Sequence, residues 1–204
     1  MRIALYGGTG MIGSRIAREA VSRDHAVTAI SRNLGDERVD GVQSRKGDAA
    51  DADGVARAAA EHDVVVSAIA PSRTGVRHQV FLHAIEVLAD NVGTRRLIVV
   101  GGAGSLEVAP GLRLIDAPGF PEAAKPEART QIQALDLLRG KGALLDWVYV
   151  SPAPFIAPGE RTGNYRVGVN AVFGEMISAE DYAVAIVDEI EQPRARHARI
   201  AVAY

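Results

Sequence analysis

The sequence predicts an α/β fold, a doubly wound parallel sheet with helices on both faces and a small C-terminal elaboration. Two observations lead to this prediction. Short runs rich in β-branched residues alternate with segments of helical period along most of the 204 residues. A glycine-rich turn also separates the first of these runs from the first helical segment. We therefore expect one domain over residues 1–204, in which residues 151–204 contribute a small lobe on the substrate side.

Strands are expected at six short runs, most of them rich in β-branched residues. These runs are Ile3–Tyr6, Ala26–Ile30, Val42–Lys46, Val64–Ile69, Arg96–Val100 and Leu145–Val150, of which Val42–Lys46 has the weakest pattern. A last strand is expected over His197–Tyr204, and a short extended piece over Gly163–Gly168. Trp147 lies in one of the predicted buried strands, so we expect it in the core.

Four helices are expected from apolar residues spaced three and four apart, which places them on one helical face. Their apolar stripes are Ile12, Ile16, Ala17, Ala20 and Val21; Val80, Phe81, Ala84, Ile85 and Leu88; Ile132, Leu135 and Leu138; and Ala183, Ile186, Val187 and Ile190. Ser178 followed by Asp181 has the spacing of a helix N-cap pair, so the last helix is expected to begin there.

The composition excludes several classes of protein. With 23 basic and 25 acidic residues the net charge is −2, so no basic excess supports nucleic-acid binding. The chain has no cysteine, which excludes disulfides, thiolate metal sites and a thiol nucleophile. The longest apolar stretch, Val64–Ala70, is far shorter than the ~20 residues of a membrane span. We expect a cytoplasmic monomer or homodimer that binds no metal, because the five histidines lack ligand spacing.

The segment Gly7-Gly8-Thr9-Gly10-Met11-Ile12-Gly13 follows the first strand and opens the first helix. Its glycines stand where a tight turn, close approach to a pyrophosphate, and packing of helix on strand require a residue without Cβ. The helix N-terminus then offers unpaired N–H groups to the phosphates. In this context the turn predicts a dinucleotide-binding, Rossmann-like domain with Gly7 and Gly10 in the cofactor site.

The end of the second strand bears on the choice between NAD and NADP. NAD-binding proteins usually carry an acidic residue about 20 residues after the glycine turn. Here the strand runs into Ser31-Arg32-Asn33, and the first acid is Asp36. Arg32 could instead bind a 2′-phosphate through two guanidinium N–H groups, although a solvated loop arginine would look the same. We expect NADP(H) to be favoured over NAD(H).

Small or polar residues follow the other predicted strands, at the edge where open α/β sheets bind ligands. Residues Ala68, Ile69 and Ala70, and also Gly101, would let a cofactor lie close to the backbone. Asp48 could accept a hydrogen bond from the adenine amino group or could cap the next helix. Ser105 could contact nicotinamide or substrate as a catalytic hydroxyl, or could bond its own turn.

The motifs of other reactions are missing. None of the three lysines has a tyrosine four residues before it, so the Tyr-x-x-x-Lys pair that protonates an alkoxide is absent. Gly102-Ala103-Gly104-Ser105-Leu106 lacks the last glycine of a nucleophile elbow. Flavins and quinones need such a proton donor less, because they accept hydride into a conjugated system. The chain thus suits hydride transfer from NAD(P)H to a planar small-molecule acceptor, with flavin as a possible substrate.

Several segments resemble the NAD(P)H-binding, NmrA-like atypical short-chain dehydrogenases, in particular the NADH-flavin reductase group similar to biliverdin reductase B. They are Gly7–Gly13, Val99–Leu106, Ser151–Phe155, Pro158–Gly163 and Ile177–Tyr182. The resemblance implies that Thr9, Met11 and Ile12 help to hold the pyrophosphate. It also implies that Ala68–Ala70, Pro152, Ala153 and Phe155 flank the nicotinamide half.

Two other functions remain open. One is a non-catalytic redox sensor that binds NADP and signals to a partner, as NmrA-like proteins are thought to do. The other is a reductase that uses a lone lysine as its acid, for which Lys125 is the candidate if it is not a plain surface lysine. Alanine stands where many relatives carry a tyrosine before this lysine, so tyrosine-assisted catalysis is not expected.

Overall fold

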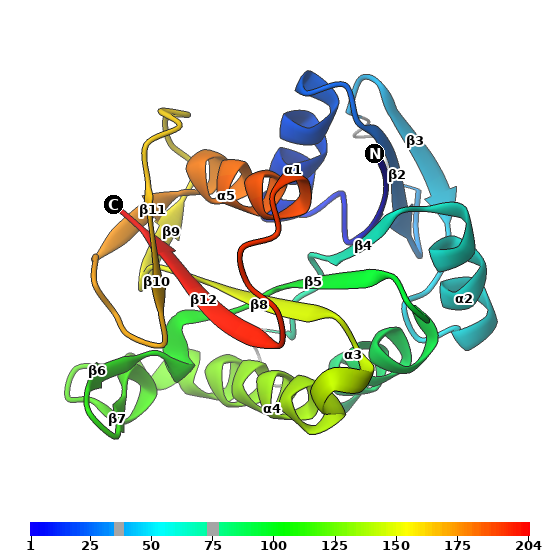
Figure 1. Ribbon diagram of the computed structural model, residues 1–204. Helices are drawn as coiled ribbons and strands as arrows, with labels where there is room; N and C mark the ends of the chain where they lie inside the picture. The colour runs from blue at the N-terminus through cyan, green and yellow to red at the C-terminus, as the bar shows by residue number, and fades with distance from the viewer. Residues whose placement is uncertain (35–38, 73–77) are drawn as a thin grey trace.

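The computed structural model describes residues 1–34, 39–72 and 78–204 and is built on one eight-stranded sheet (Figure 1). The strand order is β10-β12-β8-β5-β4-β1-β2-β3, and only β10 runs antiparallel to its neighbour. The strands are β1 (Arg2–Tyr6), β2 (Ala26–Ser31), β3 (Val42–Lys46), β4 (Val64–Ser67), β5 (Arg96–Val100), β8 (Trp147–Pro152), β10 (Arg166–Val169) and β12 (Ala198–Ala203). Strand order reverses between β1 and β4, which is the switch point at which such sheets bind ligands.

Helices cover both faces of the sheet, as expected for a doubly wound fold (Figure 1). One face carries α1 (Met11–Ser22) and α5 (Ala179–Glu191), which pack against each other. The opposite face carries α2 (Ala52–Glu61), α3 (His78–Asn91) and α4 (Lys125–Lys141). Alternating strand residues fill the two cores: Ile3 and Val66 pack under α1 and α5, while Val65 and Trp147 pack under the other three helices.

Most predicted elements are confirmed, with different ends. The strand predicted over Val64–Ile69 ends at Ser67, and the strand predicted over Leu145–Val150 is shifted to Trp147–Pro152. The extended piece predicted over Gly163–Gly168 is β10, which begins three residues later and ends one residue later. Trp147 is buried as expected.

The helix α2 and two small sheets were not predicted. The buried face of α2 consists of Val55, Ala58 and Ala59, which is too small an apolar stripe to stand out in the sequence. A hairpin of β6 (Glu107–Ala109) and β7 (Leu112–Arg113) follows β5. Outside the main sheet, β9 (Phe155–Ala157) pairs in parallel with β11 (Met176–Ser178).

Residues 151–204 therefore divide between two roles. Strands β10 and β12 extend the main sheet and α5 covers it, whereas β9, β11 and the loop after β9 stand outside it. The predicted cap is confirmed, because the Ser178 hydroxyl accepts a hydrogen bond from Asp181 N at 2.9 Å. In the described part of the chain, no helix has the length and apolar character needed to cross a bilayer.

Candidate functional site

The turn between β1 and α1 is shaped by glycines that tolerate no side chain. Gly7 has φ +82°, and a Cβ on it would lie 2.8 Å from the carbonyl carbon of Ala68. A Cβ on Gly13 would lie 2.1 Å from the carbonyl oxygen of Gly7. These two glycines are therefore required by the fold itself, because the backbone of the turn passes directly against β4 and α1.

Gly10 differs from the other glycines of the turn. It is exposed, its backbone is extended with φ −76°, and the nearest atom to an added Cβ would be the Gly7 oxygen at 3.5 Å. The protein alone would accept a side chain here, but that side chain would fill the open space in front of α1. Gly10 is also the N-cap of α1, and among described residues no side chain caps this helix and no acid lies in its first turn. The first-turn N–H groups thus face an open space suited to an anion.

Beside this turn a cavity of about 750 Å³ opens at the carboxyl ends of β1, β2, β3 and β4. It spans the switch point of the sheet, where Tyr6 and Gly7 face Ile69 and Ala70. The described lining residues are Tyr6, Gly7, Thr9, Ile30, Ser31, Arg32, Asn33, Gly47, Asp48, Ala49, Ile69, Ala70, Ser72, Val80, Phe81 and Ala84. The volume lies within the range of small-molecule and cofactor sites.

The cavity brings together six of the residues expected at the cofactor. These are Gly7, Thr9, Arg32, Asp48, Ile69 and Ala70. Four others, Gly10, Met11, Ile12 and Ala68, belong to the adjoining turn, to the start of α1 and to the end of β4 rather than to the lining.

Arg32 and Asp48 lie at the ends of β2 and β3, on the same side of the cavity. Arg32 is exposed and makes no ion pair with another described residue, so its guanidinium is available to a ligand. Asp36 lies outside the described residues. One oxygen of Asp48 accepts a hydrogen bond from Ala50 N at 3.0 Å, which shapes the turn before α2, while the residue also lines the cavity. The N-cap of α2 is Asp51 rather than Asp48.

The loop after β5 does not reach this cavity. A Cβ on Gly101 would lie 2.0 Å from Cε1 of Tyr149. The ring of that tyrosine therefore explains why position 101 requires glycine. Tyr149 also fixes the loop, since its hydroxyl accepts from Gly102 N and donates to Gln131. Ser105 is only 6% exposed, and its Oγ has no partner among described residues. Ser105 is the last residue of a short 3-10 helix, Ala103–Ser105, within this loop, and its hydroxyl is closed to solvent.

The remaining predicted residues lie after β8. Pro152 and Ala153 are buried at the end of that strand, whereas Phe155 is 60% exposed. Phe155 lines a second cavity of about 330 Å³, formed between β9, β11 and the loop after β9. Its described lining is Phe155, Ala157, Pro158, Gly159, Glu160, Thr162, Met176, Ile177, Ser178 and Tyr204. The residues predicted beside the nicotinamide are thus divided among three places: Ile69 and Ala70 line the larger cavity, Pro152 and Ala153 lie in the core, and Phe155 lines the second cavity.

One wall of the larger cavity was not predicted from the sequence. Val80, Phe81 and Ala84 of α3 line it, although their spacing indicated only a core stripe. Val80 is 49% exposed and faces the cavity, whereas Phe81 and Ala84 are buried in the core and border the cavity as well. Tyr6 was predicted only as a strand residue; burial, with a smaller effect of the Asp51 carboxylate, raises its pKa to about 12.

Lys125 lies outside both cavities. It begins α4 and its ammonium is paired with Glu122 three residues earlier. In the described part of the chain no group of three or more metal-ligating side chains occurs.

Both the sequence and the structure are similar to those of known proteins. Residues 7–193 match the model of a family described as NAD(P)H-binding. The Bacillus subtilis (strain 168) protein YwnB, described as uncharacterized, is 37% identical over 212 residues, which cover 99% of this chain and 98% of that one. A solved Burkholderia pseudomallei protein, provisionally described as exported, is 46% identical with a TM-score of 0.89, and both chains are covered completely. A solved Streptococcus pneumoniae TIGR4 protein, provisionally described as an NADH-flavin reductase, is 34% identical with a TM-score of 0.90, over 100% of this chain and 99% of that one.

Proposed function

The chain belongs to the NAD(P)H-binding family, and from this premise we propose that it is an NADPH-dependent oxidoreductase that passes hydride to a flavin, a quinone or a similar planar acceptor. The observation that carries the proposal is the open space at Gly10, where the uncapped start of α1 meets the 750 Å³ cavity. The reductase name given to the Streptococcus relative supports the same reaction class.

The residues around the cavity fit a dinucleotide. First-turn N–H groups of α1 and the Thr9 backbone would bind the pyrophosphate, since a helix N-terminus favours negative charge. The adenosine half would lie between Asp48 and Ile69, and Arg32 would bind the 2′-phosphate that distinguishes NADP from NAD. When bound, the cofactor supplies the hydride.

The acid–base groups of the cavity favour an acceptor that needs little protonation by the enzyme. The described linings of both cavities contain no lysine, histidine or cysteine. In the larger cavity the one phenol, Tyr6, has a pKa raised to about 12, so it holds its proton firmly at neutral pH. In the second cavity the Tyr204 hydroxyl already donates its proton to Asp181. An alkoxide product would need a better acid than either phenol, whereas a reduced flavin or quinone can take its proton from water.

Activity is tested by mixing the purified protein with NADPH and flavin mononucleotide and following the loss of NADPH absorbance. We expect a rate above the enzyme-free rate with at least one flavin or quinone. No excess rate across a panel of flavins and quinones would remove the oxidoreductase proposal.

Cofactor preference is tested with Arg32→Asp, and with Arg194→Asp as the matched control. Arg194 is an exposed arginine before β12, at the edge of the sheet opposite the cavity. A charged contact to phosphate contributes roughly 1.5–3 kcal/mol, so Arg32→Asp should weaken NADPH binding by about 10- to 100-fold and leave NADH binding nearly unchanged. Equal losses for both cofactors would contradict the role of Arg32.

A second candidate is a redox sensor that binds NADP without turnover, which the lack of a strong acid in the described lining also favours. Two measurements distinguish the sensor from the reductase. A sensor would show a melting shift with NADPH but no NADPH consumption, and it would retain a partner protein in only one redox state of the cofactor.

A further inference from the structure

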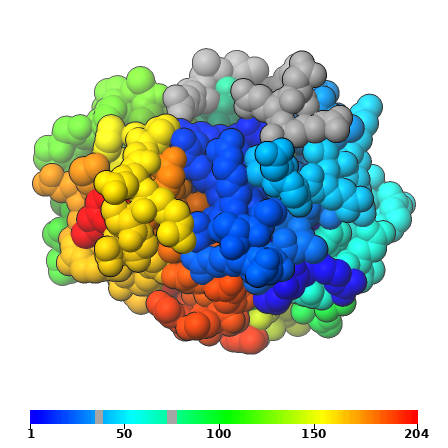
Figure 2. All heavy atoms as spheres, turned by 90° about the horizontal axis from the view of Figure 1, so that it is seen from above, coloured from blue at the N-terminus to red at the C-terminus, as the bar shows by residue number. Residues whose placement is uncertain are grey.

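The motif Pro-Gly-Glu-Arg-Thr-Gly at residues 158–163 has no part in the cofactor cavity, yet it forms a wall of the second cavity. We call residues 158–165 the strap. All of the strap except the partly buried Tyr165 is exposed, and Figure 2 shows this region, in yellow, lying against the blue residues of α1. We propose that Arg161 is a positioning residue, whose ion pair with Glu19 latches the strap against α1 and so shapes the second cavity for the acceptor. This inference rests on the proposed function.

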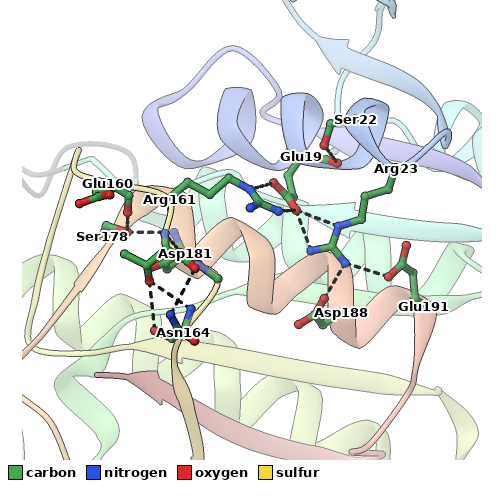
Figure 3. Close-up of polar contacts among 12 residues, drawn as sticks. Glu19, Ser22, Arg23, Glu160, Arg161, Asn164, Ser178, Asp181, Asp188 and Glu191 are labelled. Carbon is green, nitrogen blue, oxygen red and sulfur yellow. Dashed lines mark hydrogen bonds and ion pairs between the residues drawn. The ribbon is translucent and has the colours of Figure 1, made fainter.

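The middle of the strap is held by a carboxylate that has no exposed surface. Asp181 in the first turn of α5 accepts hydrogen bonds from the N–H groups of Thr162 and Gly163, both at 2.8 Å. The Thr162 hydroxyl donates to its other oxygen at 2.5 Å, and the Tyr204 hydroxyl donates to the same oxygen at 2.9 Å. Losing these contacts would leave a buried charge without partners, so Asp181 is a permanent anchor (Figure 3).

The contact between the strap and α1 differs from the Asp181 anchor, because one of its partners is exposed. The Arg161 guanidinium donates to both oxygens of Glu19, at 2.6 and 2.7 Å. Glu19 is only 6% exposed, but the Arg161 side chain is 54% exposed and can be solvated without its partner. Glu19 also binds Arg23 at 2.6 Å, so it keeps one cation when Arg161 leaves (Figure 3). The Arg161–Glu19 pair can therefore open without leaving a buried charge alone, as a latch requires.

The latch ties the strap to the helix that begins at the glycine turn beside the larger cavity. Glu19 lies nine positions after Gly10 on α1, or about 13 Å along the helix axis at 1.5 Å per residue. The helix thus begins at the predicted pyrophosphate site, and Glu19 in its C-terminal half contacts the strap. Gly159 N adds a second tie, since it donates to Glu180 at 2.7 Å, and Glu180 binds Arg15 of α1. Because hydride transfer demands reacting atoms about 3–3.5 Å apart, fixing the strap to α1 fixes the acceptor relative to the cofactor.

The test uses Arg161→Gln and Arg161→Lys, with Arg2→Gln as the matched control. Arg2 is an exposed arginine that also binds a carboxylate, Asp63, but at the start of β1. Three quantities are measured on the full chain: hydrogen exchange of residues 158–165, the Kd for NADPH, and the Kd for flavin mononucleotide in the presence of NADP, from flavin fluorescence.

For Arg161→Gln we expect exchange of the strap amides other than those of Thr162 and Gly163 to rise about tenfold, because Asp181 still holds these two. Flavin binding should weaken about tenfold, and the NADPH Kd should stay within about twofold of the wild type. Arg161→Lys keeps one charged contact, so it should lie between the wild type and Arg161→Gln. Arg2→Gln should match the wild type in all three. The inference is overturned if Arg161→Gln equals Arg2→Gln in strap exchange or in flavin binding.

These outcomes separate the latch from the proposed reaction. Wild-type turnover together with unchanged strap exchange and flavin binding in Arg161→Gln would reject the latch and keep the oxidoreductase. Flavin binding that depends on Arg161, without NADPH consumption by the wild type, would keep the latch and reject the oxidoreductase.

Discussion

Helices α1 and α5 pack side by side on one face of the sheet, but their N-termini are built in opposite ways (Figure 1). At the start of α5 the Ser178 hydroxyl caps the helix, and Glu180 and Asp181 place negative charge in its first turn. At the start of α1 stands Gly10, with neither a side-chain cap nor an acid among described residues. The protein satisfies the first-turn N–H groups of α5 with its own atoms and leaves those of α1 open.

This difference shows how one physical property of helices serves the structure at the start of α5 and, under our proposal, a ligand at the start of α1. The partial positive charge of a helix N-terminus attracts any nearby anion. In α5 that anion is part of the chain, and the same carboxylates hold the strap. In α1 the glycine turn keeps protein atoms away, so an external anion can take the same position. Four changes would break or sharpen this contrast.

The largest effect is expected from Gly13→Ala. The new Cβ would lie 2.1 Å from the Gly7 oxygen, so the turn has to move away from α1. Overpacking of this kind costs about 3 kcal/mol, and we expect that loss in the free energy of unfolding together with at least a roughly 100-fold weaker NADPH binding. Urea denaturation and NADPH titration measure both. Gly140→Ala, at a glycine of α4 with no atom near its Cβ position, is the control and should not weaken binding.

Gly10→Ser should make the start of α1 resemble that of α5. A serine N-cap would accept a hydrogen bond from the first turn, which should raise the free energy of unfolding by about 0.5 kcal/mol. The same hydroxyl would occupy the N–H groups that the pyrophosphate needs, so NADPH affinity should fall about tenfold. Gly140→Ser adds the same side chain where it meets nothing and should leave the affinity unchanged. Undiminished NADPH affinity in Gly10→Ser would show that α1 does not hold the phosphates.

Ser178→Ala makes the reverse change at α5. Removing an N-cap hydroxyl costs about 1 kcal/mol, and here the hydrogen bond to the Glu160 oxygen is lost as well. We expect a lower free energy of unfolding by that amount, measured by urea denaturation, and an unchanged Kd for NADPH. A weaker NADPH affinity at equal folded fraction would mean that the two helix starts are not independent.

The smallest expected effect is a loss of stability at acidic pH. Burial alone would raise the pKa of Asp181, but the hydrogen bonds from Thr162 and Gly163 outweigh it and lower the pKa below the ordinary 3.8. The pKa of Glu180 is lowered in the same way, against burial, by Gly159 N and Arg15. A lowered pKa stabilises the fold above the ordinary value, and this contribution is lost as the pH falls through the folded-state pKa.

The wild type should therefore lose stability as the pH falls below about 4, and Asp181→Asn should show less of this loss because it has one carboxylate fewer. Urea denaturation between about pH 7 and about pH 3 gives both curves. Parallel curves for the two proteins over the whole range would contradict the role of Asp181.

The sequence was sufficient for features that depend on local patterns. Strand–helix alternation predicted the doubly wound sheet, and the glycine pattern predicted the tight turn before α1, because Gly7 and Gly13 each have a local steric reason. Arg32 and Asp48 could be placed because the ends of parallel strands meet at one edge.

Contacts between distant segments could not be predicted in this way. The spacing of Val80 and Phe81 is the same for a core stripe and for a cavity wall, and only the packing of α3 decides between them. Gly101 was expected to make room for a cofactor, but its open space is taken by Tyr149, 48 positions away in the chain. Arg161 and Glu19 are separated by 142 positions, so no local pattern connects them.

The ring of Tyr149 against Gly101 also limits how this chain can evolve. Any side chain at position 101 would collide with the ring at 2.0 Å, and a smaller residue at position 149 would open a hole and release the loop after β5. A substitution at either position alone would therefore destabilise the loop after β5. Relatives of this protein should therefore keep both residues or replace both together.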